Sequence, residues 1–309
     1  MPVSTHSDSN GTTGPTQVTP SLLRDWPLPA PGEDKYSRGA VLVIGGARTT
    51  PGATVLAGIA ALRAGAGKMT LAVAESVAAQ VGVAFPECGA VGLPETADGS
   101  LTGEGLDLIS TYLERADAVL VGPGLDDSDL AGELLTRLLE REELSGGPER
   151  PAVVLDAYAL GGLAKLKERP EPWRGRLILT PNPTEAGILL GRDVNHLEND
   201  VAAVAEQYGA VVSCQGVIAR PSGEAPEDPG LWKITTGYGG LGTSGSGDVL
   251  AGAITGLRAR GTSGAQAACW GTHLHAAAAD RLASKLGPLG FLARELADEL
   301  PALMLELNT

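Results

Sequence analysis

The feature that most constrains the fold is a regular alternation between short apolar runs and Ala-rich helical patterns. Residues 40–46 (AVLVIGG) form an apolar run that ends in Gly-Gly, as expected of a buried parallel strand, and residues 53–66 have the Ala and Leu content of a helix. Further strand-like runs lie at residues 68–74, 118–121, 153–156 and 177–180, around residue 211, and at residues 217–219 and 231–235. This alternation predicts an α/β fold with a doubly wound, mostly parallel central sheet and helices on both faces.

The length of 309 residues fits either one large α/β domain or two smaller domains. No shift in composition marks a boundary between two domains. Residues 1–20 are rich in Ser, Thr, Gly and Pro and lack an apolar or basic targeting segment. We therefore expect a flexible tail at residues 1–20, followed by a single domain at residues 21–309. The charged segment 140–150, which contains Gly and Pro, is expected to be a surface loop.

The charge balance restricts the partners. The chain has 37 acidic and 23 basic residues, a formal net charge of −14, and only 4% aromatic residues. Such a chain is a poor partner for nucleic acid or an anionic membrane surface, and no apolar run approaches the roughly 20 residues that span a bilayer. Cys88, Cys214 and Cys269 form no metal-binding pattern and indicate reduced thiols. We expect a cytoplasmic protein that binds neither nucleic acid nor membrane.

Glycines cluster immediately before one acidic residue. Six of them, at positions 237, 239, 240, 242, 245 and 247, lead into Asp248 and an apolar helical stretch. Because glycines let the backbone approach a ligand and a helix start adds partial positive charge, this segment predicts an anion hole for a phosphate. Asp248 would stand at its mouth, where a carboxylate can accept a proton from a hydroxyl group. The alternative is that Asp248 only caps the helix and the glycines form a loop.

A second polar segment, TPNPTE at residues 180–185, follows a strand and begins a helix. Asn182 and Glu185 would lie at the carboxyl edge of the sheet, where they could contact a ligand or a hydrated metal. Ordinary helix initiation explains the same residues. His273 and His275 lie two residues apart on a helical pattern, so we expect packing or surface roles rather than a metal pair.

Five segments, in this order along the chain, carry a resemblance to one known family. They are residues 41–73, 121–125, 153–160, 179–191 and 240–257. Together they resemble the ADP/ATP-dependent NAD(P)H-hydrate dehydratases, which have the ribokinase-like fold. The resemblance extends over about residues 35–305 and agrees with the α/β fold expected from the alternation.

The resemblance implies a repair enzyme that dehydrates hydrated NADH or NADPH at the expense of ADP or ATP, with Mg²⁺ as the expected metal. It implies phosphoryl transfer to the ring hydroxyl followed by elimination of phosphate, with Asp248 as the catalytic base. Substrate contacts are implied for Ala53, Gly124, Asn182 and Asp248. Nucleotide or phosphate contacts are implied for Thr243, Gly245, Ser246, Gly247, Cys214, Gln215 and Gly216. Asp156 and Glu185 would support the site, the metal ligands stay unassigned, and relatives suggest a homo-oligomer.

The chain departs from the family pattern in four places. Asp156-Ala157-Tyr158 stands where Asp-Ala-Asp is usual, and the bulky Tyr158 could fill part of the cleft. Asn182 and Thr184 replace a His and a Gly. Near Cys214-Gln215 the usual Lys-Gly pair is replaced, which removes a positive charge from the phosphate side of the site.

Two alternatives remain open from the sequence. A catalytically degenerate family member, which binds a nucleotide or a partner protein without turnover, is compatible with these four replacements. A small-molecule kinase of the same fold is compatible with the Gly-Ser-Gly-Asp segment at residues 245–248 taken alone.

Overall fold

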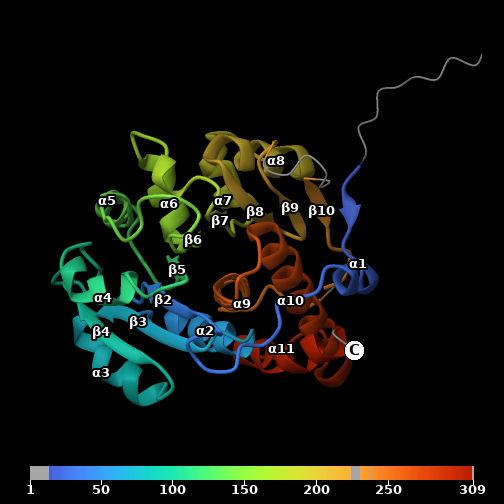
Figure 1. Ribbon diagram of the computed structural model, residues 1–309, viewed down its shortest axis with the longest axis horizontal. Helices are drawn as coiled ribbons and strands as arrows, with labels where there is room; N and C mark the ends of the chain where they lie inside the picture. Colours follow the sequence, from blue (N-terminus) through green and yellow to red (C-terminus); the bar gives the residue numbers. More distant parts are fainter. Residues whose placement is uncertain (1–13, 224–229, 238, 308–309) are drawn as a thin grey trace, which may run out of the picture.

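The computed structural model describes residues 14–223, 230–237 and 239–307, and in this part the strands form one continuous sheet (Figure 1). The sheet has ten strands in the order β1-β10-β9-β8-β7-β6-β5-β2-β3-β4. The strands are β1 (Thr16–Gln17), β2 (Ala40–Ile44), β3 (Lys68–Ala74), β4 (Gly89–Leu93), β5 (Ala118–Val121), β6 (Ala152–Leu155), β7 (Leu177–Leu179), β8 (Ala210–Cys214), β9 (Val217–Ala219) and β10 (Leu231–Lys233).

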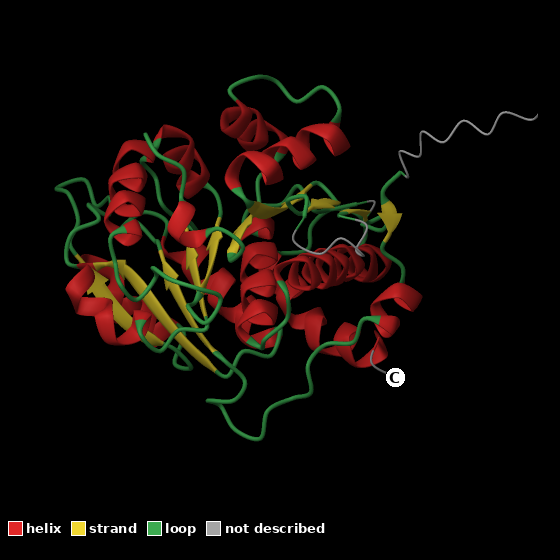
Figure 2. Ribbon diagram, turned by 45° about the horizontal axis from the view of Figure 1, so that its top comes forward, coloured by secondary structure: helices red, strands yellow, loops and turns green. Residues whose placement is uncertain are grey.

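Helices cover both faces of this sheet (Figure 2). The α-helices are α1 (Pro20–Asp25), α2 (Pro51–Arg63), α3 (Glu75–Ala84), α4 (Ser110–Leu113), α5 (Ser128–Leu139), α6 (Tyr158–Lys165), α7 (Pro183–Leu190), α8 (Leu197–Tyr208), α9 (Ser246–Ala259), α10 (Gly264–Leu286) and α11 (Ala293–Leu307). Two short 3₁₀ helices lie at Leu106–Ile109 and Glu171–Trp173.

The expected mostly parallel sheet is confirmed. Every pair from β8 through β7, β6, β5, β2 and β3 to β4 is parallel. Only the β8–β9 and β9–β10 pairs are antiparallel. The eight apolar runs expected as strands each contain one. The sequence predicts a hairpin at residues 220–229, between β9 and β10, and residues 224–229 lie outside the described residues.

Consecutive side chains of the central strands enter two different cores, because strand side chains alternate between faces. In β2, Val41 and Val43 pack in the core that includes α2, α9 and α10, whereas Leu42 and Ile44 pack in the core that includes α5, α6 and α8. Both sets are almost completely buried. A parallel sheet covered on both faces requires such uninterrupted apolar runs, which is why the sequence shows them.

The amino-terminal boundary differs from the expectation. Thr16 and Gln17 pair with Trp232 and Lys233, and α1 begins at Pro20 with Thr19 as its N-cap. The predicted tail boundary at residue 20 is therefore too late, while residues 1–13 lie outside the described residues. The strand β4 was also not predicted, because its sequence GAVGL contains two glycines and is only partly buried at the sheet edge.

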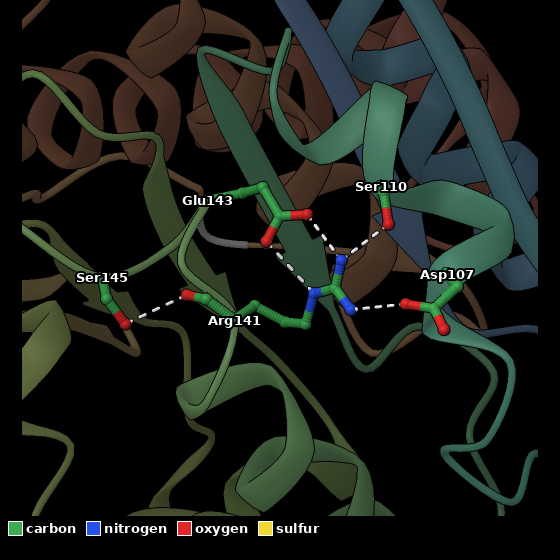
Figure 3. Close-up of polar contacts among 5 residues, drawn as sticks. All are labelled: Asp107, Ser110, Arg141, Glu143 and Ser145. Carbon is green, nitrogen blue, oxygen red and sulfur yellow. Dashed lines mark hydrogen bonds and ion pairs between the residues drawn. The ribbon is translucent and has the colours of Figure 1, made fainter.

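The segment 140–150 is a loop, as expected, and Arg141 fastens it to the body of the protein (Figure 3). The Arg141 guanidinium donates to Asp107 at 2.7 Å, to Ser110 at 2.6 Å and to both oxygens of Glu143. These bonds hold the pKa of the Glu143 carboxyl below its ordinary value. The partners of Arg141 lie in the first 3₁₀ helix, at the start of α4 and in the loop itself, and none lies at the carboxyl edge of the sheet. We therefore assign this cluster a structural role.

Candidate functional site

The carboxyl ends of the parallel strands bring the motif residues to one edge of the sheet. The turn at residues 45–47 follows β2, Gly122 to Gly124 follow β5, Asp156 follows β6, and Thr180 to Asn182 follow β7. Parallel strands β2, β5, β6 and β7 are neighbours, so these segments lie next to one another. This edge is where open α/β sheets bind ligands.

The start of α9 has the features of an anion-binding helix terminus. Gly245 is its N-cap with φ of 88°, a conformation that favours glycine, and a Cβ atom there would lie 2.5 Å from Leu56. Around Gly247, the position of a Cβ has no other atom within 4 Å, so the first turn faces open space. The backbone N–H of Ser246 donates to the Thr243 carbonyl at 3.2 Å. The N–H groups of Gly247 and Asp248 have no backbone acceptor within the described residues. Two donors and the helix dipole are therefore available to an anion.

Two carboxyl groups at this edge have strongly raised pKa values. Burial raises the pKa of Asp248 to about 6. Asp156 is only 6% exposed, and burial, together with the facing charges of Asp248 and Glu185, raises its pKa to about 7. The Thr180 hydroxyl donates to Asp156 Oδ1 at 2.8 Å and opposes that rise. Carboxyl groups that titrate near neutrality can take up and release protons, which is typical of acid–base sites.

The backbone around Asp156 is held in an uncommon conformation. Ala157 has φ of 51°, one of two non-glycine residues with positive φ in the described chain. Gly122 is required beside it, because a Cβ there would lie 1.8 Å from the Asp156 carbonyl oxygen. Such strain persists where neighbouring structure imposes it and concentrates at functional sites. Tyr158 follows as the first residue of α6 and leaves 48% of its surface exposed.

Ala53 and Gly124, expected on the substrate side, come together from distant parts of the chain. A Cβ on Gly124 would lie 3.2 Å from Ala53 Cβ and 2.4 Å from the Thr50 carbonyl oxygen. The Thr50 hydroxyl donates to the Gly124 carbonyl at 2.8 Å. Gly124 has φ of 71°, so glycine serves both its conformation and this close approach.

Asn182 and Glu185 form a capping box at the start of α7. Asn182 Oδ1 accepts from the Glu185 N–H at 2.9 Å, and Glu185 Oε2 accepts from the Asn182 N–H at 2.8 Å. Helix initiation therefore explains the hydrogen bonds of both side chains. Burial also raises the pKa of Glu185 above its ordinary value. The exposed Asn182 side chain still lies at the rim of the edge described above.

Cys214, Gln215 and Gly216 lie at the tight turn between β8 and β9. Gln215 and Gly216 have φ of 47° and 82°, the signature of a two-residue hairpin turn. The Cys214 side chain is fully buried, and burial raises its thiol pKa to about 12. The thiol therefore does not face a ligand, and any contact from this turn would come from its backbone or from the exposed Gln215.

The structure also contains a site contact that the sequence did not predict. His275 on α10 lies 3.0 Å from the Ser246 hydroxyl, from Nε2 to Oγ. His273 and His275 are both buried, which fits the expected packing role and excludes the surface alternative. A separation of 29 residues between Ser246 and His275 leaves no local signal for their contact.

The described residues contain no group of three or more His, Cys, Asp or Glu side chains arranged to hold a metal ion. Within the same part of the chain, no helix is both long and apolar enough to cross a membrane.

Comparison with known proteins decides the family. The family model for NAD(P)H-hydrate dehydratase matches residues 41–302. The chain belongs to this family. An ADP-dependent (S)-NAD(P)H-hydrate dehydratase of Xanthomonas campestris is 40% identical over 298 residues, covering 94% of this chain and 98% of the relative. The bifunctional NAD(P)H-hydrate repair enzyme Nnr of Moorella thermoacetica is 37% identical over 87% of this chain, which spans 50% of that longer protein.

Solved structures agree with the fold. The ADP/ATP-dependent NAD(P)H-hydrate dehydratase of Bacillus subtilis, co-crystallised with ATP and Mg²⁺, matches with a TM-score of 0.74 and 27% identity, over 96% of this chain and 99% of that one. A ribokinase-like superfamily protein of Enterococcus faecalis matches with a TM-score of 0.77 at 20% identity, over 97% and 99%. The ribokinase-like fold is confirmed.

Proposed function

We propose that this protein dehydrates hydrated NADH or NADPH with ADP or ATP as the phosphoryl donor. The observation that carries the proposal is the position of Asp248, whose carboxyl pKa is raised to about 6, in the first turn of a helix whose Gly247 and Asp248 N–H groups have no recorded acceptor among the described residues. The first relative named above is an ADP-dependent dehydratase of almost the same length, which supports the same activity.

The residues divide the proposed reaction between them. Asp248 accepts the proton of the ring hydroxyl while the hydroxyl oxygen bonds to the terminal phosphorus of the nucleotide. The bond between that phosphorus and the departing nucleotide breaks in the same step. The N–H groups at the start of α9 stabilise the negative charge on the transferring phosphoryl group. The carbon–oxygen bond then breaks and phosphate leaves, while the neighbouring carbon loses a proton and the ring double bond returns.

The remaining sequence-derived residues complete the proposed site. Ala53, Gly124 and Asn182 contact the hydrated nicotinamide side. Thr243, Gly245 and the Gln215-Gly216 turn lie on the nucleotide side. The proposal also includes a homo-oligomer and a cytoplasmic location, both expected from the sequence.

The residues present fit Mg²⁺ as an ion carried by the nucleotide. Mg²⁺ keeps several waters and commonly binds substrate phosphates with few protein carboxylates. That preference suits an edge where the described residues form no cluster of three metal-binding side chains. Glu185 and Asn182 at the rim would contact such an ion through water, and its charge would offset that of the phosphates.

An Asp248→Asn variant tests the proposal, with Asp298→Asn on the exposed face of α11 as the matched control. We expect wild-type protein and the control to restore reduced nicotinamide absorbance from the hydrate with ADP or ATP. Asp248→Asn should lose roughly 10²–10⁴-fold in kcat, the range for general-base catalysis, and bind nucleotide within a few-fold of wild type. Full activity in Asp248→Asn would contradict the assigned role.

A further inference from the structure

One helix, α10, contacts both ends of the glycine-rich segment that leads to the phosphate site. We define the glycine loop as Gly237 and residues 239–245, between β10 and α9. At its beginning, the Gly237 N–H donates to Asp280 Oδ2 at 2.8 Å. At its end, the next residue, Ser246, meets His275 at 3.0 Å. His275 and Asp280 both belong to α10.

The Ser246–His275 contact is enclosed in the protein. Ser246 is 3% exposed and His275 is 5% exposed, so the Ser246 hydroxyl points into the interior and not toward the open space beside Gly247. Burial lowers the pKa of His275 to about 4, so its ring is neutral at physiological pH. A neutral ring and a hydroxyl satisfy each other, and removing either leaves a buried polar group without a partner.

The glycine loop has little structure of its own to hold it. Its glycines are conformationally free in the unfolded chain, so ordering them is entropically costly. Two of these glycines lie close to residues of other segments. A Cβ on Gly237 would lie 2.9 Å from Ala276, and one on Gly240 would lie 2.3 Å from Phe291. Polar anchors at the two ends therefore matter more here than in a loop with fewer glycines.

We propose that His275 and Asp280 are positioning residues for nucleotide binding, which together hold the glycine loop and the first turn of α9 in the arrangement that receives phosphate. Neither side chain touches the ligand. His275 acts through Ser246, and Asp280 acts through the Gly237 backbone. The identity of the ligand rests on the proposed function, whereas the anchoring of the loop does not.

The test compares disruptive and conservative variants at each position. His275→Leu and Asp280→Leu remove the hydrogen bonds, while His275→Gln and Asp280→Asn keep a polar atom at a similar place. The leucine variants should raise the KM and Kd for ADP or ATP about tenfold and also lower kcat, with the KM for the hydrate within about threefold, because the displaced N–H groups bind phosphate in the ground state and stabilise it in the transition state. The conservative variants should restore most of the nucleotide affinity.

A double-mutant cycle identifies the Ser246–His275 contact itself. Ser246→Ala and His275→Leu break the same hydrogen bond, so the double variant should bind nucleotide about as well as either single variant. Fully additive losses in affinity would contradict a shared contact. An equal rise in the KM for hydrate and nucleotide would indicate general damage and would overturn the positioning role.

Amide hydrogen exchange in the nucleotide-free protein gives a second readout. Residues 239–247 should exchange faster in His275→Leu and Asp280→Leu than in wild type, with the exchange of β6 unchanged. Unchanged exchange in this segment would overturn the anchoring. If wild-type protein bound neither ADP nor ATP, the proposed function and the nucleotide as ligand would both fall, while the exchange result would still decide whether α10 anchors the loop.

Discussion

At the scale of single residues, the carboxyl group of Asp156 shows how burial can serve a site at the expense of stability. The Thr180 hydroxyl donates a hydrogen bond to this buried carboxyl group. Gly122, which has no side chain, leaves room for the Asp156 backbone. The carboxyl pKa of about 7 lies well above the ordinary value of 3.8, so the folded protein holds a proton that the unfolded chain has already lost between these two values. The folded state is therefore penalised progressively as pH rises from about 4 to about 7.

Replacing Asp156 by Asn should remove this penalty. The amide oxygen can still accept from Thr180, so the free energy of unfolding should rise by up to about 4 kcal/mol at pH 8 and change little at pH 4. Urea unfolding at the two pH values measures the difference, with Asp298→Asn, which removes only an exposed ion pair with Arg63, as a control that should change stability by less than about 1 kcal/mol at either pH. The same gain at pH 4 and pH 8 would show that proton binding is not the cause.

Sequence reasoning reached some site residues and not others for physical reasons. Asp248 was predicted because the glycines and the helix start that define its surroundings are adjacent to it in the chain. The contact between Ser246 and His275 depends on how α9 packs against α10, which no local pattern records.

At the scale of elements, glycines also set the distance between α2 and α9. A Cβ on Gly252 would lie 2.1 Å from the Ala57 carbonyl oxygen, and one on Gly256 would lie 2.3 Å from that of Ala61. The two helix backbones are therefore in close contact. Because α9 carries Asp248 at its start and α2 follows the substrate-side turn, this contact fixes the two sides of the site relative to each other.

Gly252→Ala should destabilise the protein, since the added methyl group meets backbone and not a movable side chain. We expect a loss of at least about 2 kcal/mol in the free energy of unfolding, within the range for overpacked cores. Gly82→Ala, within α3, is the matched control. Its Cβ would lie 3.5 Å from the Cβ of Ala90 in β4, an ordinary van der Waals distance. It should be neutral or stabilising by up to about 1 kcal/mol, because alanine favours helix. Equal denaturation midpoints for the two variants would contradict the close-contact account.

The predictability of the elements follows their burial. Strands β2, β3, β5 and β6 are mostly apolar runs of four to seven residues because both faces are covered, and the sequence predicted each within one or two residues. Edge strands β1 and β4 were missed because one has only two residues and the other is interrupted by glycine and partly exposed. Their pairing is decided by neighbours that are distant in sequence.

At the scale of the whole molecule, the acidic chain and its proposed anionic ligands are compatible. The net charge of −14 opposes broad binding of polyanions. A phosphate held by backbone N–H groups at a helix start needs no net positive charge.

The proposed activity couples dehydration of the hydrate to phosphoryl transfer at the start of α9. The most direct measurement follows reduced nicotinamide absorbance and released phosphate together, with hydrated NADPH and either ADP or ATP. We expect one phosphate to be released for each molecule of hydrated NADPH that is converted to NADPH, and no conversion without nucleotide. Nucleotide consumption that yields a stable phosphorylated product without recovery of absorbance would contradict it and indicate a kinase. Nucleotide binding without turnover, where a control dehydratase is active, would equally contradict it.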